Sequence, residues 1–218
     1  MEDLSIYLKP TQYIDSDSPS IRLISRKLST PHPHETAKAL FYFVRDEITY
    51  NPYSLFYLPE HYPASRTLEK GEGYCIQKAV LLAALARACN IPARLVFADI
   101  TNHLMPPKLW KMMETNLFYH GYNELYLDGR WIRVTPTFDK GMCERLNLMP
   151  VEFDGRHPAI FHSHDRQGRL HIEYTKDHGH CADLPFEKLM DVLKRYYTTQ
   201  TLNSWKAAGT GAQKGDES

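Results

Sequence analysis

Hydrophobic residues recur at helical spacing in five segments of the chain. The clearest segment begins at Cys75, and its alanines and leucines return every three or four residues until Pro92 interrupts the pattern. Another segment begins after Asp17, where Pro19 would occupy the first helical turn. The helices expected on this basis lie at about 19–29, 35–47, 75–89, 106–115 and 185–197.

Strand patterns follow the cysteine helix. Two alternating runs, His120–Leu127 and Arg130–Thr135, flank the dipeptide Asp128-Gly129, which is a strong hairpin signal. Further strands are expected at 93–98 and near 170–174. Helices followed by mainly antiparallel strands predict an α+β fold.

The chain of 218 residues suits one domain with additions at both ends. Residues 1–34 are expected to form an N-terminal extension and helix, and 35–140 the core. Residues 141–205 would complete the domain with strands and a helix. Residues 51–70 are rich in Pro, Tyr and Ser and are expected to form a long loop, and 206–218 a disordered tail.

Charge and composition narrow the choice of partners. Lys+Arg and Asp+Glu number 26 each, so no charge excess favours nucleic acid or an anionic membrane as a partner. The N-terminus lacks a secretory signal pattern, and no apolar run reaches the roughly 20 residues of a membrane span. The four cysteines form no CxxC pair, which predicts free thiols in a reducing compartment and a cytoplasmic location.

Cys75 stands where a nucleophile would be activated. Gly71 and Gly73 precede it and permit a sharp turn, and a helix follows it. The positive end of a helix lowers the pKa of a thiol, and its backbone N–H groups can hold an oxyanion. The alternative is that Cys75 is a small buried residue that happens to begin a helix. The other cysteines, at 89, 143 and 181, lack this context and are expected to pack in the interior.

His120 is the candidate base. The Asp128-Gly129 turn fixes a register in which Tyr122 faces Thr135. His120 lies two residues before Tyr122 and therefore shares a face with Thr135, at a diagonal distance of roughly 7–8 Å between Cα atoms. A thiol nucleophile needs such a base and an orienting group. The alternative for His120 is an ordinary surface hydrogen bond at the end of a strand.

These motifs resemble the transglutaminase-like superfamily, whose members share a papain-like fold. The similar segments are GEGYC at 71–75, RACNIPARLVF at 87–97 and HGYNELYLDGRWIRVTPTF at 120–138. The resemblance covers roughly residues 35–140. It implies that Cys75 is the nucleophile and His120 its base, and that neither metal nor organic cofactor is needed.

One position departs from the family pattern. The family has an aspartate just before the proline of the closing strand, and this chain has Thr135 there. A threonine hydroxyl can accept a hydrogen bond from an imidazole but carries no charge. Asp139 could bend back to serve as the third member, and Asp154 is a remoter candidate. Thr135 ranks first by position and Asp139 first by chemistry.

Several aromatic and metal-binding side chains remain to be placed. Tyr53, Tyr74 and Tyr122 are candidate substrate-binding residues, although such rings can equally pack the interior. The segment 106–115, with its Trp and Met side chains, could form a lid or cover the core. The run His178–Cys181 could bind a metal, but adjacent His180 and Cys181 are poorly spaced for one tetrahedral ion. No metal is therefore predicted.

Two functional hypotheses follow. In the first, the chain is an enzyme that attacks an amide in a peptide or protein and forms a thioester, which water or an amine resolves; hydrolysis is the favoured outcome. In the second, the same groove binds a peptide or protein partner without catalysis, as the missing aspartate would suggest. The oligomeric state does not follow from the sequence.

Overall fold

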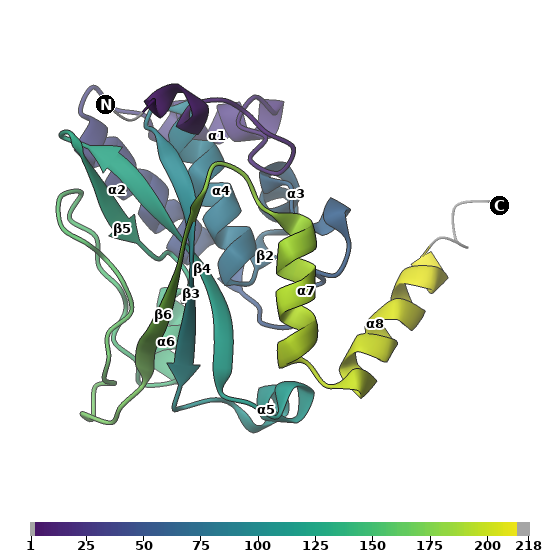
Figure 1. Ribbon diagram of the computed structural model, residues 1–218. Helices are drawn as coiled ribbons and strands as arrows, with labels where there is room; N and C mark the ends of the chain where they lie inside the picture. Colours follow the sequence, from purple (N-terminus) through teal and green to yellow (C-terminus); the bar gives the residue numbers. More distant parts are fainter. Residues whose placement is uncertain (1–2, 213–218) are drawn as a thin grey trace.

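A four-stranded antiparallel sheet forms the centre of the fold, shown in Figure 1 for the computed structural model, which describes residues 3–212. The strands follow the order β5-β4-β3-β6. Their bounds are Ala93–Asn102 for β3, Leu117–Leu127 for β4, Arg130–Val134 for β5 and Ile172–Cys181 for β6. All three pairings are antiparallel, which confirms the expected α+β class.

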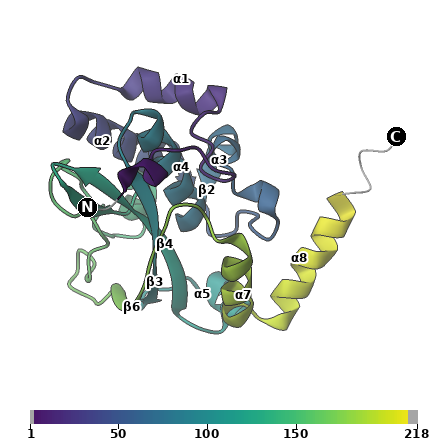
Figure 2. The same cartoon turned by 45° about the horizontal axis from the view of Figure 1, so that its top comes forward.

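Helix α4 (Cys75–Ala88) is the central helix and packs on this sheet (Figure 1). Its residues from Ile76 to Arg87 are all buried, as expected for a helix that is apolar on every side. Helices α1 (Pro19–Leu28), α2 (Pro33–Tyr42) and α3 (Ala64–Lys70) pack around α4, and Figure 2 shows them from above. They hold the first turn of α4 in a fixed place beside strand β4.

Shorter elements complete the chain. Strand β1 pairs with β2 in a separate parallel ladder just before α4. Helix α7 packs on β4, whereas α8 extends to one side of the domain in both views (Figures 1 and 2). The bounds are Leu4–Tyr7 for η1, Phe43–Glu47 for the π-helix η2, Thr49–Tyr50 for β1, Pro59–His61 for η3, Glu72–Gly73 for β2, Pro107–Met113 for α5, Lys140–Arg145 for α6, Phe186–Tyr196 for α7 and Thr199–Ala212 for α8.

The predicted hairpin register is confirmed. Leu127 pairs with Arg130, and Glu124 pairs with Arg133. The ladder between β4 and β5 ends at the pair formed by Asn123 and Val134. The edge of β4 at Gly121 is therefore not covered by β5. That opening lies beside the beginning of α4.

Two sequence expectations are wrong. The expected loop at 51–70 contains the helices η3 and α3, because packing against α4 stabilises a helix that its composition does not suggest. The expected disordered tail from Lys206 is helical as far as Ala212, because Ala and Lys have high helix propensity and α8 has already formed its first turns. Residues 213–218 of that tail lie outside the described residues.

One hydrophobic core unites the parts of the described chain. It includes Ile14 and Ile21 from the N-terminal extension, α4, the inner face of the sheet, and Leu189 from α7. No helix within residues 3–212 has the length and apolarity that crossing a bilayer requires.

Candidate active site

Cys75 is the first residue of α4, as the sequence predicted. Helix α3 ends at Gly71 in the left-handed conformation (φ 65°), and strand β2 then leads directly into α4. Tyr74 is the N-cap residue, and its backbone N–H donates to Oε1 of Gln77 at 3.2 Å. The sulfur therefore lies at the end of α4 where the backbone N–H groups have no partners within the helix.

His120 lies on β4 and reaches Thr135 just beyond the end of β5. Nε2 of His120 is 3.0 Å from Oγ1 of Thr135, and this oxygen is 3.0 Å from Oγ1 of Thr137. All three side chains are buried. Phe161 packs on the imidazole with a centroid distance of 4.8 Å, and Tyr122 stacks on it at 5.6 Å. Tyr174 makes a third, T-shaped contact at 6.1 Å, so the ring is held by one hydrogen bond and three aromatic contacts.

Gly121 brings the helix and the strand together. Its backbone N–H lies close enough to the Cys75 sulfur to oppose the rise that burial causes in the pKa of the thiol. A Cβ atom added at Gly121 would lie 2.7 Å from Cγ1 of Ile76, closer than side chains tolerate. Only a glycine therefore lets α4 approach this closely. Since Gly121 follows His120 directly, the same contact places the thiol next to the imidazole-bearing residue.

Burial keeps both groups neutral. It raises the pKa of the Cys75 thiol to about 11, although the N–H groups of Gly121, Ile76 and Cys75 itself act in the opposite direction. Burial lowers the pKa of His120 to about 3. The sequence expectation of a lowered thiol pKa is therefore wrong for this structure, because loss of hydration outweighs the helix terminus. The pair rests as thiol and imidazole.

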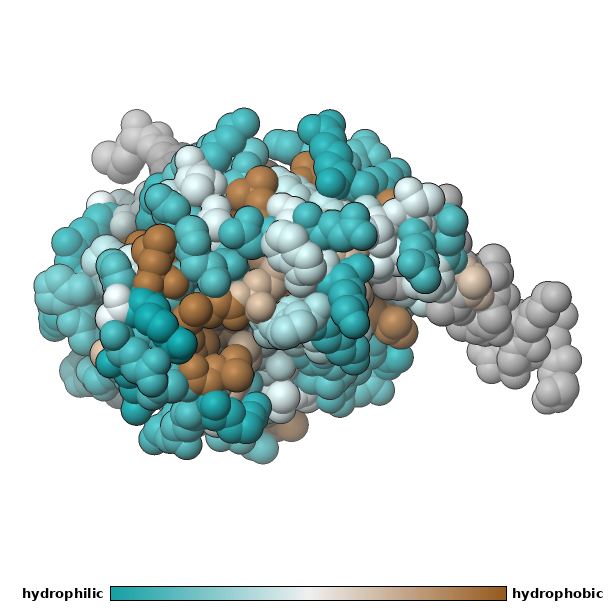
Figure 3. Space-filling view, turned by 90° about the horizontal axis from the view of Figure 1, so that it is seen from below, coloured by the Kyte–Doolittle hydropathy of each residue, from teal (hydrophilic) through white to brown (hydrophobic). Residues whose placement is uncertain are grey.

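Cys75 and His120 line the same cavity, which has a volume of about 480 Å³. Its walls come from the lower ends of β3 and β4, from α5 and α6, and from the segment that carries Phe161. Seen from below, hydrophobic residues gather around a hollow on this face (Figure 3). Thr137 also lines the cavity, so the end of the hydroxyl chain from His120 lies beside it.

Asp139 has a structural position rather than one beside the imidazole. Its Oδ1 accepts from the backbone N–H of Met142 at 2.7 Å and so caps α6, and its Oδ2 accepts from that of Tyr50 at 3.0 Å. Asp154 binds His157 and the backbone on an exposed loop. Of the three orienting candidates, Thr135 is the one that the fold brings to His120.

The three tyrosines proposed to bind substrate differ in exposure: two are buried and one is exposed. Tyr74 is buried, and its hydroxyl is 2.7 Å from that of Tyr62. Tyr122 is buried behind His120. Tyr53 is partly exposed, and Nζ of Lys108 lies 4.3 Å from its ring centroid. This contact joins the loop after β1 to α5, but Tyr53 does not line the cavity, whereas Tyr50 does.

The remaining cysteines and histidines form no second centre in the described part of the chain. Cys143 is buried, and burial raises its pKa to about 11. Cys89 packs near Ser25. No group of three or more His, Cys, Asp or Glu side chains within residues 3–212 is arranged to hold a metal ion. His178 instead lies beside Asp99, with 2.9 Å between Nε2 and Oδ1.

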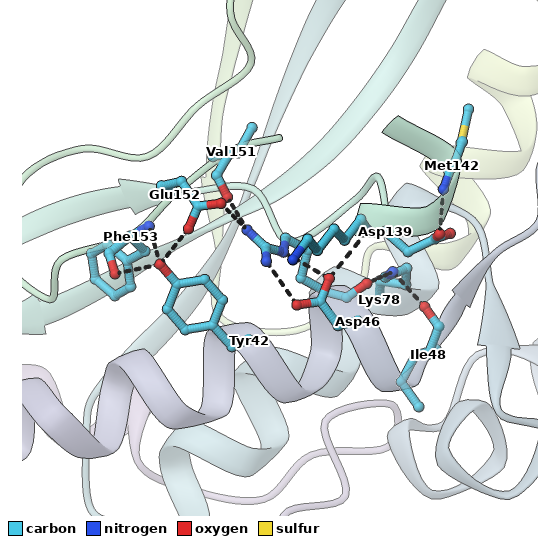
Figure 4. A network of polar contacts seen from close by, with 11 residues as sticks. Tyr42, Asp46, Ile48, Lys78, Asp139, Met142, Val151, Glu152 and Phe153 are labelled. Atoms are coloured by element: carbon cyan, nitrogen blue, oxygen red, sulfur yellow. Dashed lines mark hydrogen bonds and ion pairs between the residues drawn. The ribbon is translucent and has the colours of Figure 1, made fainter. Parts of the chain in front are cut away.

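A buried lysine in α4 binds the segment that leads to the cavity wall. Nζ of Lys78, one turn after Cys75, donates to the carbonyl oxygen of Arg45 at 3.0 Å and to that of Ile48 (Figure 4). Arg45 lies within η2, and Ile48 directly follows the end of that helix. Both precede Tyr50, which lines the cavity. Burial lowers the pKa of Lys78 to about 7. The network fixes the cavity wall to α4.

Sequence reasoning missed Gly121, Thr137 and Lys78. Thr137 had only a weak signal, as the second hydroxyl residue of the segment 135–137, because the strand ends at Val134. Lys78 was visible as one of two charged residues, with Arg87, within a mainly apolar helix. The role of Gly121 had no signal of its own, since it depends on how closely α4 approaches β4.

Comparison with known proteins identifies one family model, that of the transglutaminase-like superfamily, which matches residues 22–136. No curated protein matches the chain. Among solved structures, a candidate cysteine protease from Cytophaga hutchinsonii is 23% identical, with a TM-score of 0.49, over 63% of this chain and 43% of that one. The periplasmic domain of TgpA from Pseudomonas aeruginosa is 21% identical, with a TM-score of 0.40, over 54% of this chain and 42% of that one. The chain thus spans less than half the length of either structure.

Proposed function

This chain belongs to the transglutaminase-like superfamily, and from that membership and its site we propose that it is a cysteine-dependent acyl-transfer enzyme. Cys75 attacks the carbonyl carbon of an amide in a peptide or protein, and His120 acts as its base. Water then resolves the acyl-enzyme, which makes the overall reaction a hydrolysis. The proposal also places the protein in a reducing compartment such as the cytoplasm, where Cys75 stays a thiol.

One observation carries the proposal. The thiol at the start of α4 and the imidazole on β4 line a common cavity, and Gly121, which follows His120, lies against Ile76, which follows Cys75. A cysteine that merely packed in the core would not need to share an open cavity with a buried histidine. The family match covers both residues.

The hydroxyl chain supports a defined tautomer. If Thr135 donates to Thr137, its oxygen is free to accept the Nε2–H of His120. Nδ1 then carries the lone pair and takes the proton from the Cys75 thiol as sulfur bonds to the carbonyl carbon. The proton passes to the departing amine. The N–H groups at the start of α4 stabilise the oxyanion.

Trapping the acyl-enzyme tests this proposal. Wild-type protein is incubated with a library of peptide thioesters and amides, and intact mass followed by peptide mapping locates any added acyl group. We expect acylation of Cys75, its loss in Cys75→Ala, and slow acylation in His120→Ala. Acylation that persists in Cys75→Ala, or falls equally on Cys89, contradicts the proposal.

A binding module is the second candidate. The neutral resting pair and the uncharged Thr135 favour it, because neither stabilises a thiolate–imidazolium pair. In that case a peptide would bind in the cavity and be recovered unchanged. Equilibrium binding without acylation, and with equal affinity in Cys75→Ala, would decide for this candidate.

A further inference from the structure

The cavity beside Cys75 is mainly apolar, although Asn102, Thr137 and Arg169 also line it. Its volume of about 480 Å³ lies within the roughly 300–1,000 Å³ that small-molecule sites occupy. Ile100, Phe118 and Phe138 line its inner part, and Leu104, Leu146 and Met142 line it nearer α5 and α6. A space of this size next to a nucleophile admits more than the carbonyl group under attack.

The cavity offers no counter-charge to a charged substrate group. Among the described residues that line it, Arg169 alone carries a formal charge, and Nε of Arg169 donates to Asp165 Oδ2 at 2.7 Å. Asp165 is itself buried and also accepts the backbone N–H groups of Gln167 and Arg169. The charge of Arg169 is therefore already compensated. Burial lowers the pKa of His171, another lining residue, to about 4, so its ring is neutral at pH 7.

A charged side chain in this space would lose its hydration without gaining a partner. An aliphatic or aromatic group would instead lose only unfavourable contact with water. In acyl transfer, the acyl group remains bonded to the sulfur while the amine departs. The largely apolar space that begins at the sulfur therefore fits the part of the substrate that stays.

We propose that this cavity binds a large apolar group on the acyl side of the bond that Cys75 attacks. This inference rests on the proposed acyl-transfer function. In the step concerned, the S–C bond forms as the C–N or C–S bond to the leaving group breaks, the thiol proton goes to that group, and water later releases the apolar acid. Each methylene that enters the cavity is expected to raise the rate of acylation about fourfold, equivalent to ~0.8 kcal/mol.

A first experiment tests the cavity without acyl chemistry. Iodoacetamides that carry N-methyl, N-butyl and N-octyl groups are compared at pH 9, and the rate of Cys75 labelling is divided by the rate with free N-acetylcysteine. We expect the normalised rate to rise by about tenfold or more from methyl to octyl. A reagent of similar length that ends in a carboxylate or an ammonium group should gain nothing. Equal normalised rates for all reagents overturn the inference.

Two exposed residues provide a matched pair of variants. Leu146 lines the cavity and Met149 does not, and each is 45% exposed. Leu146→Asp should reduce the octyl-to-methyl rate ratio several-fold, whereas Met149→Asp should leave it unchanged. Leu146→Gln repeats the test without a charge should the Asp variant be poorly folded. A ratio that is unaffected by both Leu146 variants contradicts the inference.

A second experiment distinguishes the sources of an apolar acyl group. Thioesters of octanoic acid, N-acetyl-phenylalanine, N-acetyl-glutamate and N-acetyl-lysine, all with one leaving thiol, are compared for acylation of Cys75. Faster octanoyl transfer indicates a fatty-acyl substrate, and faster phenylalanyl transfer indicates a peptide. Faster transfer of glutamyl or lysyl groups overturns the inference while leaving the proposed function intact. Failure of every thioester, with the octyl preference retained in labelling, contradicts the proposed function alone.

Discussion

Nε2 of His120 lies 3.0 Å from Oγ1 of Thr135, at the position where the family pattern places an aspartate. The hydroxyl orients the ring but supplies no negative charge to an imidazolium. Burial of the ring acts in the same direction, since it lowers the pKa of His120 to about 3. The site therefore avoids a permanent ion pair, and the thiol proton must move during the attack on the substrate.

Thr135→Val should slow acylation of Cys75 about tenfold, equivalent to ~1.4 kcal/mol. Valine has nearly the same shape but leaves the imidazole N–H without an acceptor, which costs ~1–3 kcal/mol in a buried site. Thr137→Val should have a smaller effect, because it acts only through the Thr135 hydroxyl. Single-turnover acylation measures both, and Thr135→Ser should restore the rate.

Thr175→Val is the control for this series, because its hydroxyl donates to the backbone of β3 on the exposed part of β6. It should leave acylation unchanged. Thr135→Val with a wild-type acylation rate would show that Thr135 does not orient the base.

The reactivity of Cys75 should rise steeply with pH. Only the thiolate is alkylated, and burial raises the pKa of Cys75 to about 11. The rate of labelling by iodoacetamide should therefore increase about tenfold per pH unit from pH 7 to pH 10. Peptide mapping after timed labelling follows Cys75 separately from the other cysteines. A plateau below pH 8.5 would mean that an imidazolium stabilises the thiolate, contrary to the neutral pair described above.

Short sequence motifs predicted two parts of the site: the pairing of β4 with β5 and the residue at which α4 begins. The turn at Asp128-Gly129 determines the register of β4 and β5, and that register alone predicts that Thr135 lies near His120. The glycines before Cys75 likewise predicted the start of α4. In both cases the determining residues lie within a few positions of the feature that they determine.

Features that depend on packing between distant segments could not be predicted in this way. The pKa of Cys75 is set by how completely β4 and the cavity walls enclose it. Helix α3 forms within a stretch of loop-like composition because α4 offers it a surface. Asp139 gave a partial signal, since an aspartate is a common N-cap residue, but α6 is too short to show helical periodicity.

Asp139→Ala should lower the free energy of unfolding by about 1 kcal/mol, because it removes the N-cap of α6 and an acceptor for Tyr50. Asp139→Asn keeps a capping oxygen and should change stability by only a few tenths of a kcal/mol. Urea denaturation measures both variants. Acylation of Cys75 by folded Asp139→Asn should match the wild type; a large loss of acylation in this stable variant would instead make Asp139 the orienting residue.

Gly121→Ala should impair both stability and acylation. The added methyl group would lie 2.7 Å from Cγ1 of Ile76, and relieving such overpacking typically costs ~1–3 kcal/mol. Separation of β4 from α4 would also withdraw the N–H group from the Cys75 sulfur. Thermal unfolding and single-turnover acylation measure the two effects.

Gly141→Ala is the matched control for Gly121→Ala, because a Cβ at Gly141 would come no closer than 3.3 Å to its neighbours. It should remain as stable as the wild type. If Gly121→Ala also kept wild-type stability and acylation, the close approach of α4 to β4 would not be needed for the site.

Lys78→Met should remove a pH dependence of stability. Lys78 is fully buried, and burial lowers its pKa from 10.5 to about 7. Between these values the unfolded chain holds a proton that the folded chain lacks, so the free energy of unfolding rises with pH. The stabilising contribution is complete above pH 10.5, decreases as the pH falls from 10.5 towards 7, and is absent below pH 7. The slope attributable to Lys78 between pH 7 and pH 9 should be about 1.4 kcal/mol per pH unit.

Urea denaturation at pH 7, 8 and 9 tests this expectation as a difference between the wild type and Lys78→Met. Contributions of the tyrosines and of Cys75 are common to both proteins and cancel in that difference. Lys38→Met is the control, because Lys38 forms only an exposed pair with Glu35 and should leave the wild-type slope unchanged. Parallel stability curves for the wild type and Lys78→Met would show that Lys78 stays charged when buried. Its two carbonyl partners and the nearby carboxylates of Asp46 and Asp139 would then compensate its loss of hydration.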